Sequence, residues 1–122
     1  MQEPIDVKIS QLTPESRNVN LIVKVLERSE AREFYSQRSR KHLRVCDITV
    51  GDESGIIKMT LWNEQVNDFH VGDIVKITNA YTVLFKGHMK LQIGKNGNYK
   101  TISREIIRVN LSNDMSEATY QE

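Results

Sequence analysis

Apolar residues recur at every second position in five separate segments of this chain, which is the spacing of β-strands with one buried face. The segments are 19–28, 41–50, 56–62, 74–84 and 88–93. In the first of them, Val19, Leu21, Val23 and Val25 share one side of the strand, whereas Lys24 lies on the other. A chain of 122 residues can close one core around such strands, so the sequence predicts a single all-β domain.

The connections between these segments narrow the fold further. Residues 29–40 read as a long basic loop with some hairpin character, and residues 51–55 (GDESG) as a tight turn. Residues 63–69 favour a short helix with Asn63 as its cap, and a two-residue turn follows Phe85. This order of strands, loops and helix is that of an OB-fold. We therefore predict a five-stranded Greek-key barrel with a short helix between the third and fourth strands.

The segments outside the barrel pattern are less regular. Residues 1–18 form an N-terminal extension, in which Thr13-Pro14-Glu15 favours a short helical turn. Residues 94–98 are rich in Gly and Asn and are expected to turn the chain. Residues 99–109 are expected to extend the sheet or to pack across it, and they end the domain.

The last residues differ from the rest in charge and hydropathy. Residues 110–122 contain three acidic residues and no basic one, and they show no strand or helix period. Such a segment has little apolar surface to bury. It is predicted to be a flexible acidic tail that follows an OB-fold domain of residues 1–109.

Charge is distributed unevenly, although the net charge is only +1. Residues 28–44 hold six basic and two acidic residues, residues 45–73 one basic and six acidic, and residues 74–104 six basic and no acidic. Two basic stretches around an acidic one indicate an anionic partner on one face, with the acidic part turned away. Ordinary solvated surface charge is the alternative.

The basic residues nearest the expected ligand face are Arg32, Arg38, Arg40, Lys41, Arg44, Lys58, Lys86 and Lys90. Together they would hold the phosphates of a nucleic acid.

Most aromatic rings lie outside the aliphatic pattern. Trp62 shares the polar side of its segment with Lys58, and Phe85 stands at a turn. Tyr81 points inward if the alternation is strict, and outward only if a bulge at Asn79-Ala80 resets the phase. An OB-fold binds ligands over its second and third strands, between the loops that these rings and basic residues occupy. We therefore predict that Trp62, Tyr81 and Phe85 form a stacking platform for bases.

Three further rings lie on the short helix and in the basic loop. Phe69 is expected inside the barrel, on the short helix. Phe34 and Tyr35 lie in the basic loop, where they either add a stacking contact or pack within a hairpin.

The sequence contains no motif that indicates an enzymatic or metal-binding function. His42, His70, His88 and Cys46 lack the spacing of a zinc site, and the late glycines lack the ending of a phosphate-binding loop. The sequence therefore predicts no enzyme activity, no metal and no cofactor. It shows no signal-peptide pattern and no apolar run that could span a membrane, and its lone cysteine fits a reducing compartment. A soluble intracellular protein is expected.

Four stretches together resemble a known family: VNLIVKVLERSEAR, VGDESGIIKMTLW, VGDIVKITNAYTVLFKG and MKLQIGK. Over roughly residues 10–95 they are similar to the single-OB-fold single-stranded DNA-binding proteins (SSB) of archaea and to their eukaryotic relatives, the single-stranded DNA-binding subunits of the SOSS complex. The resemblance implies that Trp62, Tyr81 and Phe85 stack on successive bases. Gln92 stands where some eukaryotic relatives carry another aromatic.

The resemblance also implies a role. It points to largely sequence-independent binding of single-stranded DNA in replication, recombination and repair. The compartment would be the cytoplasm, at the nucleoid, in an archaeon and the nucleus in a eukaryote. Repair or replication proteins would contact the tail or the loops, although archaeal relatives often carry a longer tail than residues 110–122.

Two alternatives stay open at this point. An OB-fold RNA-binding or tRNA-binding module would use the same rings and charges, because contacts to the 2′-OH are not visible in a sequence. A protein-interaction subunit of a larger genome-maintenance complex would instead dock its partner on Phe85 and the 29–40 loop.

Overall fold

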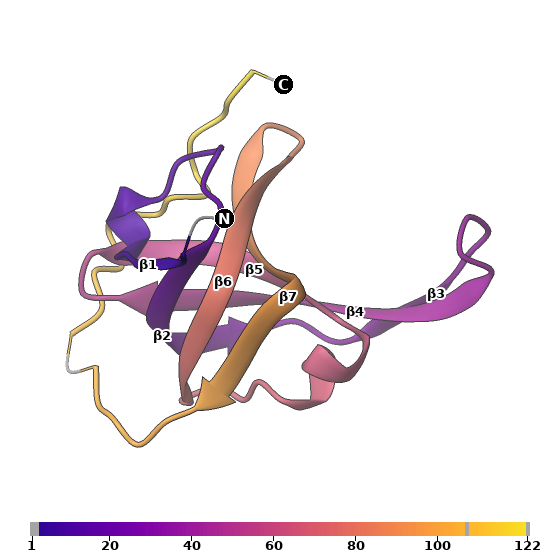
Figure 1. Ribbon diagram of the computed structural model, residues 1–122, viewed down its shortest axis with the longest axis horizontal. Coiled ribbons are helices and arrows are strands. Elements are labelled where there is room, and N and C mark those ends of the chain that lie inside the picture. The colour runs from indigo at the N-terminus through magenta and orange to yellow at the C-terminus, as the bar shows by residue number, and fades with distance from the viewer. Residues whose placement is uncertain (1–2, 107, 122) are drawn as a thin grey trace.

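The chain folds into a β-barrel in the computed structural model, which describes residues 3–106 and 108–121 (Figure 1). The elements in chain order are β1 (Ile5–Asp6), η1 (Ile9–Gln11), β2 (Val19–Arg28), β3 (Arg32–Ser36), β4 (Lys41–Asp52), β5 (Gly55–Trp62), η2 (Asn63–Asn67), β6 (Ile74–Phe85) and β7 (His88–Thr101). Strand β2 pairs antiparallel with both β4 and β6, β4 with β5, and β6 with β7. A short parallel pairing of β5 with β7 closes the ring. The predicted five-stranded OB-fold barrel is confirmed, with a single 3-10 turn, η2, between its third and fourth strands.

An aliphatic core fills the barrel. The inward residues of β2, β5 and β7, such as Val23, Leu61 and Leu91, are completely buried. Ile9 in η1 and Val66 in η2 join the same cluster and close the core from two sides. Phe69 is the one buried ring among the eight aromatics of the chain, as predicted, although η2 ends at Asn67 and does not include it. The remaining seven rings are partly or fully exposed at the surface.

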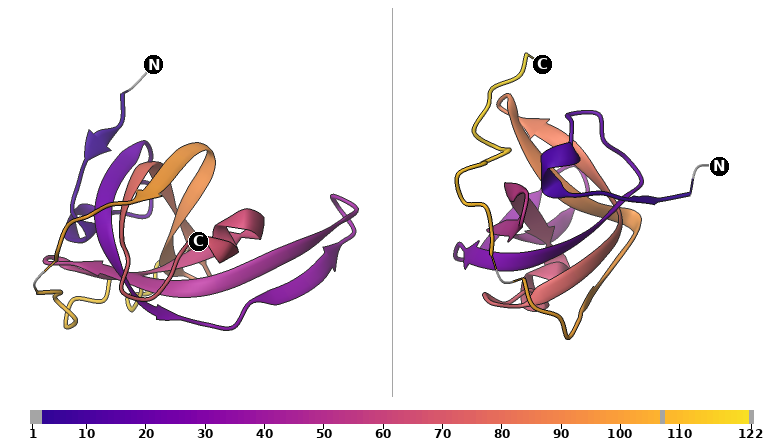
Figure 2. Two further views of the ribbon diagram at one scale, coloured as in Figure 1. Left: turned by 90° about the horizontal axis from the view of Figure 1, so that it is seen from below. Right: turned by 90° about the vertical axis from the view of Figure 1, so that its left-hand side faces the viewer.

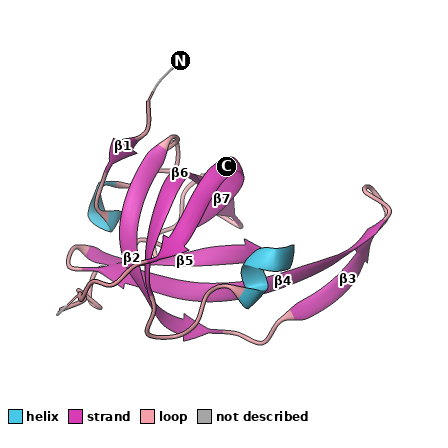
Figure 3. Ribbon diagram, turned by 60° about the horizontal axis from the view of Figure 1, so that its bottom comes forward, coloured by secondary structure: helices cyan, strands magenta, loops and turns pink. Residues whose placement is uncertain are grey.

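The segment predicted as a long basic loop is largely a hairpin. Strand β3 pairs with the first half of β4, from Arg32 opposite Val45 to Ser36 opposite Lys41. This hairpin, hereafter the arm (residues 32–45), projects well beyond the barrel (Figures 1 and 3). Because successive residues of a strand point to opposite faces, the arm carries one row of side chains toward the barrel mouth and another row behind it.

Three local predictions are wrong. Residues 94–98 do not reverse the chain. Strand β7 continues through them as an irregular stretch, while its pairing with β6 shifts register between Thr78 and Ala80. The first helical turn lies at η1 and not at Thr13, which forms only a simple turn to Ser16. The cap residue of η2 is Trp62, whose N–H donates to Gln65 Oε1 at 2.9 Å.

Residues 113–120 pack against the barrel, so this part of the predicted flexible tail is held in place (Figure 2). Strands β5 and β7 pair only around Lys58 and Met59, so they leave backbone groups near Ile56 and Met89 without a strand partner. Residues 113–120, hereafter the C-terminal strap, supply those partners. The N–H of Ile56 donates to the carbonyl of residue 113, and the N–H of Met115 donates to the carbonyl of Ile56 at 2.8 Å.

Side chains of the strap also fill the junction between β5 and β7. The Ser116 hydroxyl accepts from the N–H of Lys58 and donates to the carbonyl of Met89, and Ser116 itself is buried. Tyr120 packs against the core cluster, and its N–H donates to the carbonyl of Gly87 at 2.7 Å. Buried backbone groups need such partners, which explains why a polar segment without periodicity becomes ordered here.

Candidate nucleic-acid interface

A bulge in β6 turns Tyr81 to the outside of the barrel. Asn79 has a φ of 60° at the point where the pairing with β7 shifts register. Beyond it Ala80 and Thr82 are buried, whereas Tyr81 is partly exposed. The predicted bulge is therefore confirmed. Asn tolerates the left-handed conformation better than most residues, which allows the phase change at this position.

A groove of about 670 Å³ lies on the outer face of the barrel, between the arm and the end of β6. Its lining residues come from β3, β4, β5, β6 and β7: Arg32, Glu33, Phe34, Val45, Asp47, Thr60, Trp62, Val83, Leu84, Phe85, Lys90 and Gln92. Two of the three predicted platform rings, Trp62 and Phe85, thus share one groove, and Phe34 joins them. Rings exposed together in a groove are the arrangement that binds unpaired bases.

Trp62 meets the arm at one end of the groove. Its ring lies edge-on to Phe34, with 6.4 Å between the centroids and 73° between the planes. Val45, which pairs with Trp62, also pairs with Arg32 in the arm. Phe34 is 44% exposed, so the arm contributes a ring to the groove that stays accessible to a ligand. This contact connects the projecting arm with the end of β5.

Phe85 forms the other end of the groove and is 55% exposed. The Lys90 ammonium lies 4.8 Å from its ring centroid, and the Lys86 ammonium lies 5.4 Å away. Cations this close to an aromatic face are attracted by its quadrupole. Two of the predicted phosphate-binding lysines therefore lie next to the Phe85 ring.

Tyr81 lies beside the groove and does not line it. Its hydroxyl is 3.3 Å from Oε1 of Gln92, which does line the groove. Tyr81 itself lines a neighbouring hollow of about 410 Å³ that includes Lys95. Gly94 makes room for the ring, because a Cβ at that position would lie 2.9 Å from Tyr81 Cε1.

The two rings of the arm point to opposite sides. Phe34 lines the groove, but Tyr35 lies behind the arm, 5.3 Å from the His42 ring centroid. Because they are adjacent in β3, both cannot face the same ligand site. The structure therefore brings Phe34, and not Tyr35, to the predicted platform.

The predicted basic residues fall into four places. Arg32 and Lys90 line the groove, and Lys86 lies at the Phe85 ring beside it. Arg38, Arg40 and Lys41 are exposed at the tip of the arm. Arg44 lies behind the arm, where its guanidinium donates to Asn67 Oδ1 at 3.1 Å. Lys58 lines a small hollow of about 190 Å³ next to the groove. Arg44 is thus turned away from the rings.

An acidic residue, Asp47, lies inside the groove, which corrects the expectation that the acidic stretch faces away. Its Oδ2 accepts from Arg32 at 3.2 Å, and its Oδ1 accepts from the Thr60 hydroxyl at 3.1 Å and from Lys90 at 3.5 Å. The strand period is the signal that reveals this position, because Asp47 stands between the buried Cys46 and Ile48 and so must face outward.

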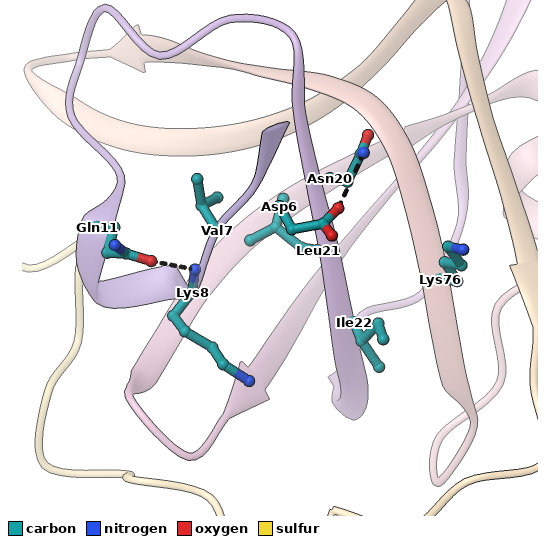
Figure 4. A pocket seen from close by; sticks show the side chains of 8 residues that line it. All are labelled: Asp6, Val7, Lys8, Gln11, Asn20, Leu21, Ile22 and Lys76. Atoms are coloured by element: carbon teal, nitrogen blue, oxygen red, sulfur yellow. Dashed lines mark hydrogen bonds between the residues drawn. The ribbon is translucent and has the colours of Figure 1, made fainter. Parts of the chain in front are cut away.

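A separate hollow of about 320 Å³ lies between β1, η1 and β2 (Figure 4). Its lining residues are Asp6, Val7, Lys8, Gln11, Asn20, Leu21, Ile22 and Lys76. It shares no residue with the groove and contains no ring. The Asn20 amide donates to Asp6 Oδ1 at 3.1 Å within it.

Among residues 3–106 and 108–121, no three His, Cys, Asp or Glu side chains lie together in a way that could hold a metal ion. In the same described residues, no helix has the length and apolar character needed to cross a bilayer.

Comparison with known proteins places the chain in a family. The profile of the family "Single-stranded DNA binding protein Ssb-like, OB fold" matches residues 12–101. The chain is 38% identical over 90 residues to the single-stranded DNA binding protein Ssb of Saccharolobus solfataricus, a match that covers 74% of this chain and 60% of Ssb. It is 30% identical over 128 residues to an uncharacterised protein of Arabidopsis thaliana, covering 98% and 84% of the two chains.

The fold agrees with these matches. The solution structure of a hypothetical protein from Arabidopsis thaliana superposes with a TM-score of 0.79 at 29% identity, covering 99% of this chain and 89% of the other. The matched residues 12–101 include the whole barrel and every residue that lines the groove. The chain belongs to the family of Ssb-like single-stranded DNA binding proteins with an OB-fold.

Proposed function

We propose that this protein binds single-stranded DNA in the groove between the arm and the β6–β7 turn. The observation that carries the proposal is the groove itself, which Trp62, Phe34 and Phe85 line together with Arg32 and Lys90. Apolar side chains that gather in one accessible groove mark a site of interaction. The family to which the chain belongs supports single-stranded DNA as that ligand.

Stacking would contribute to the binding free energy at each ring. A base stacked on an aromatic side chain contributes about 1–3 kcal/mol, whatever the base, because every base offers a π-face. Trp62 and Phe85 would hold two bases at the ends of the groove, and Phe34 would cover one of them from the arm. Tyr81 would take a further base where the strand leaves the groove past Gln92. One barrel would then hold about 4–6 nucleotides, within the range for OB-folds.

Phosphates would follow the basic residues. Arg32, Lys86 and Lys90 lie at the rings, and Arg38, Arg40 and Lys41 lie at the tip of the arm that would close over the strand. Each phosphate neutralised releases counterions, so the affinity would fall steeply as salt rises. Largely sequence-independent binding follows from this combination of stacking and charge.

The role would be to bind and protect DNA strands, not to react with them. The groove lining, which lies wholly within the described residues, contains no histidine or cysteine and no cluster that could hold a metal ion. Exposed single strands arise in replication, recombination and repair. The protein would act in the cytoplasm at the nucleoid of an archaeon, or in the nucleus of a eukaryote, and meet proteins of those processes through its arm.

Fluorescence anisotropy of end-labelled oligonucleotides tests this proposal. We expect oligo-dT to bind at low salt, to be released as salt rises, and to be preferred over a DNA duplex of the same length. Competition by an RNA of matched sequence separates a DNA-binding from an RNA-binding role. Absence of binding to every nucleic acid at low salt would contradict the proposal and favour a protein-interaction role.

A further inference from the structure

The floor of the groove carries a carboxylate at the place where a nucleic acid would lie. Asp47 stands between Arg32 on the arm side and Lys90 on the Phe85 side, and it accepts a hydrogen bond from each. The Thr60 hydroxyl donates to the same carboxylate from the neighbouring strand, at 3.1 Å. The side chain of Asp47 is nevertheless 34% exposed, so the carboxylate remains open to the groove.

A carboxylate in this position constrains how a DNA strand can lie. A phosphate at the floor would meet a like charge, and it would have to displace Arg32 and Lys90 from Asp47. A base edge carries no formal charge and meets no such charge repulsion. Trp62 and Phe85, whose rings would stack the bases, line the same groove. The strand should therefore run with its bases toward the floor and its phosphates toward the arm and the rim.

An ionised carboxylate accepts hydrogen bonds and cannot donate them. It has about four lone-pair sites, and Arg32, Thr60 and Lys90 use three of them. Cytosine presents an exocyclic amino group, which is a donor that Asp and Glu side chains accept from. Uracil and thymine present a carbonyl oxygen at the same ring position, which would face the carboxylate acceptor to acceptor and leaves only the neighbouring N3–H as a donor.

We propose that Asp47 reads the edge of one base in the groove and favours a base with an exocyclic amino group, cytosine above all, over thymine or uracil. This inference rests on the proposed function and adds a preference at one position to binding that is otherwise insensitive to sequence. Thr60 acts as a positioning residue, because its hydroxyl donates to Oδ1 of Asp47 and so fixes the orientation of the carboxylate.

The structure also allows a simpler role for Asp47, that of a competitor for the two cations. In that role the carboxylate only holds Arg32 and Lys90 until phosphates take them. Removal of its charge would then strengthen the binding of every oligonucleotide by the same factor. A ratio of two affinities cancels this uniform effect, whereas a base contact changes the ratio.

The test compares oligo-dC with oligo-dU, whose bases differ only at C4 and in the proton on N3. Dissociation constants are measured by anisotropy at one salt concentration and neutral pH, with strands of about nine nucleotides, within the site size of OB-folds. We expect the unsubstituted protein to bind oligo-dC about fivefold more tightly, the effect of one modest base contact. In Asp47→Asn the ratio should fall to about one, because an amide can turn its oxygen or its NH₂ toward either base.

Two further variants serve as controls. Glu30→Gln removes the same charge from an exposed position near the arm and should leave the dC to dU ratio unchanged. Thr60→Val should lower the ratio and Thr60→Ser should restore it, since serine keeps the hydroxyl. Circular dichroism melting curves verify that each variant is folded.

The outcomes separate the two proposals. Equal affinity of the unsubstituted protein for oligo-dC and oligo-dU would overturn the inference but leave single-stranded DNA binding intact, and this arm of the test needs no variant to fold. A uniform gain in affinity in Asp47→Asn, with the ratio unchanged, would likewise overturn it and assign Asp47 the competitor role. Failure of both strands to bind the unsubstituted protein would contradict the proposed function itself.

Discussion

The inner and outer faces of the same two strands have opposite characters. In β5, Met59 and Leu61 are fully buried, whereas Trp62 next to them opens onto the groove. In β6, Ala80 is fully buried, whereas Tyr81 reaches the surface beside the groove. Aliphatic side chains thus fill the barrel, and rings cover its outside. Because one strand supplies both, a change at one residue should affect stability and a change at the next should affect binding.

The largest effect is expected for the double substitution Trp62→Ala with Phe85→Ala. Loss of two stacking rings should weaken the binding of oligo-dT by about 2–6 kcal/mol, at about 1–3 kcal/mol for each base. The free energy of unfolding should change by about 1 kcal/mol or less, because neither ring belongs to the buried core. Anisotropy and chemical denaturation measure the two quantities.

Leu111→Ala is the matched control for this change, since it shortens an exposed apolar side chain that does not line the groove. It should alter neither quantity. A large loss of stability in the double variant would show that the rings are part of the core, and the contrast between the two faces would then fail.

The opposite result is expected one residue earlier in β5. Leu61→Ala removes a fully buried side chain and should lower the free energy of unfolding by about 2–5 kcal/mol. The folded fraction should still bind oligo-dT as before, because the outer face of β5 is unchanged. Urea denaturation and anisotropy at low temperature check both parts, and weaker binding by fully folded protein would argue against separate faces.

The C-terminal strap should behave like the inner face. Ser116→Ala leaves the N–H of Lys58 and the carbonyl of Met89 without their side-chain partner. Loss of such buried partners costs about 1–3 kcal/mol of stability. Removal of residues 110–122 should cost at least as much, since it also uncovers the core beside Tyr120. Hydrogen exchange at Ile56 and Lys58 should quicken in both variants, and unchanged exchange would instead favour a loosely held tail.

The smallest effect concerns Tyr99, a ring that packs on Phe69, 5.0 Å between centroids, and donates to Asp68 at 2.7 Å. Partial burial, followed by the hydrogen bond to Asp68 and the charges of Asp68 and Glu64, raises the pKa of Tyr99 to about 12. The protonated hydroxyl therefore stabilises the fold fully below the ordinary tyrosine pKa of about 10. That contribution is lost as pH rises through about 12.

Stability measured by urea denaturation should therefore fall between about pH 10 and pH 12, the ordinary and the folded pKa of this group. Tyr99→Phe should flatten this part of the profile. An identical decline of stability in both proteins would assign the pH dependence to other groups. This measurement does not report on binding through the outer rings.

Local periodicity is enough to predict most of the barrel and part of the site. Trp62 lies in phase with other outward residues of β5, and Asn79 offers the backbone freedom for the bulge that turns Tyr81 outward. The same period, applied residue by residue, places Asp47 in the groove. The overall charge of residues 45–73 predicts the opposite, because a net charge does not distinguish the two faces of a strand.

Other features depend on distant parts of the chain. The strap has no period of its own, and its order comes from backbone groups of Ile56 and Met89 that β5 and β7 leave open to it. Gly94 and Gly97 resemble turn residues, yet they make room within β7 for the Tyr81 ring and for the backbone of β6. Neither requirement can be read from neighbouring residues, because each arises only when the strands come together.

Trp62 offers the most direct test of the central claim, since it is the only tryptophan in the chain and lies in the groove. Oligo-dT is titrated into the protein at low salt while the tryptophan emission is recorded. Stacking of a base on Trp62 should quench the emission in a saturable manner, and added salt should reverse the change. Emission that stays constant at micromolar oligonucleotide and low salt would contradict the claim that bases stack on Trp62 in the groove.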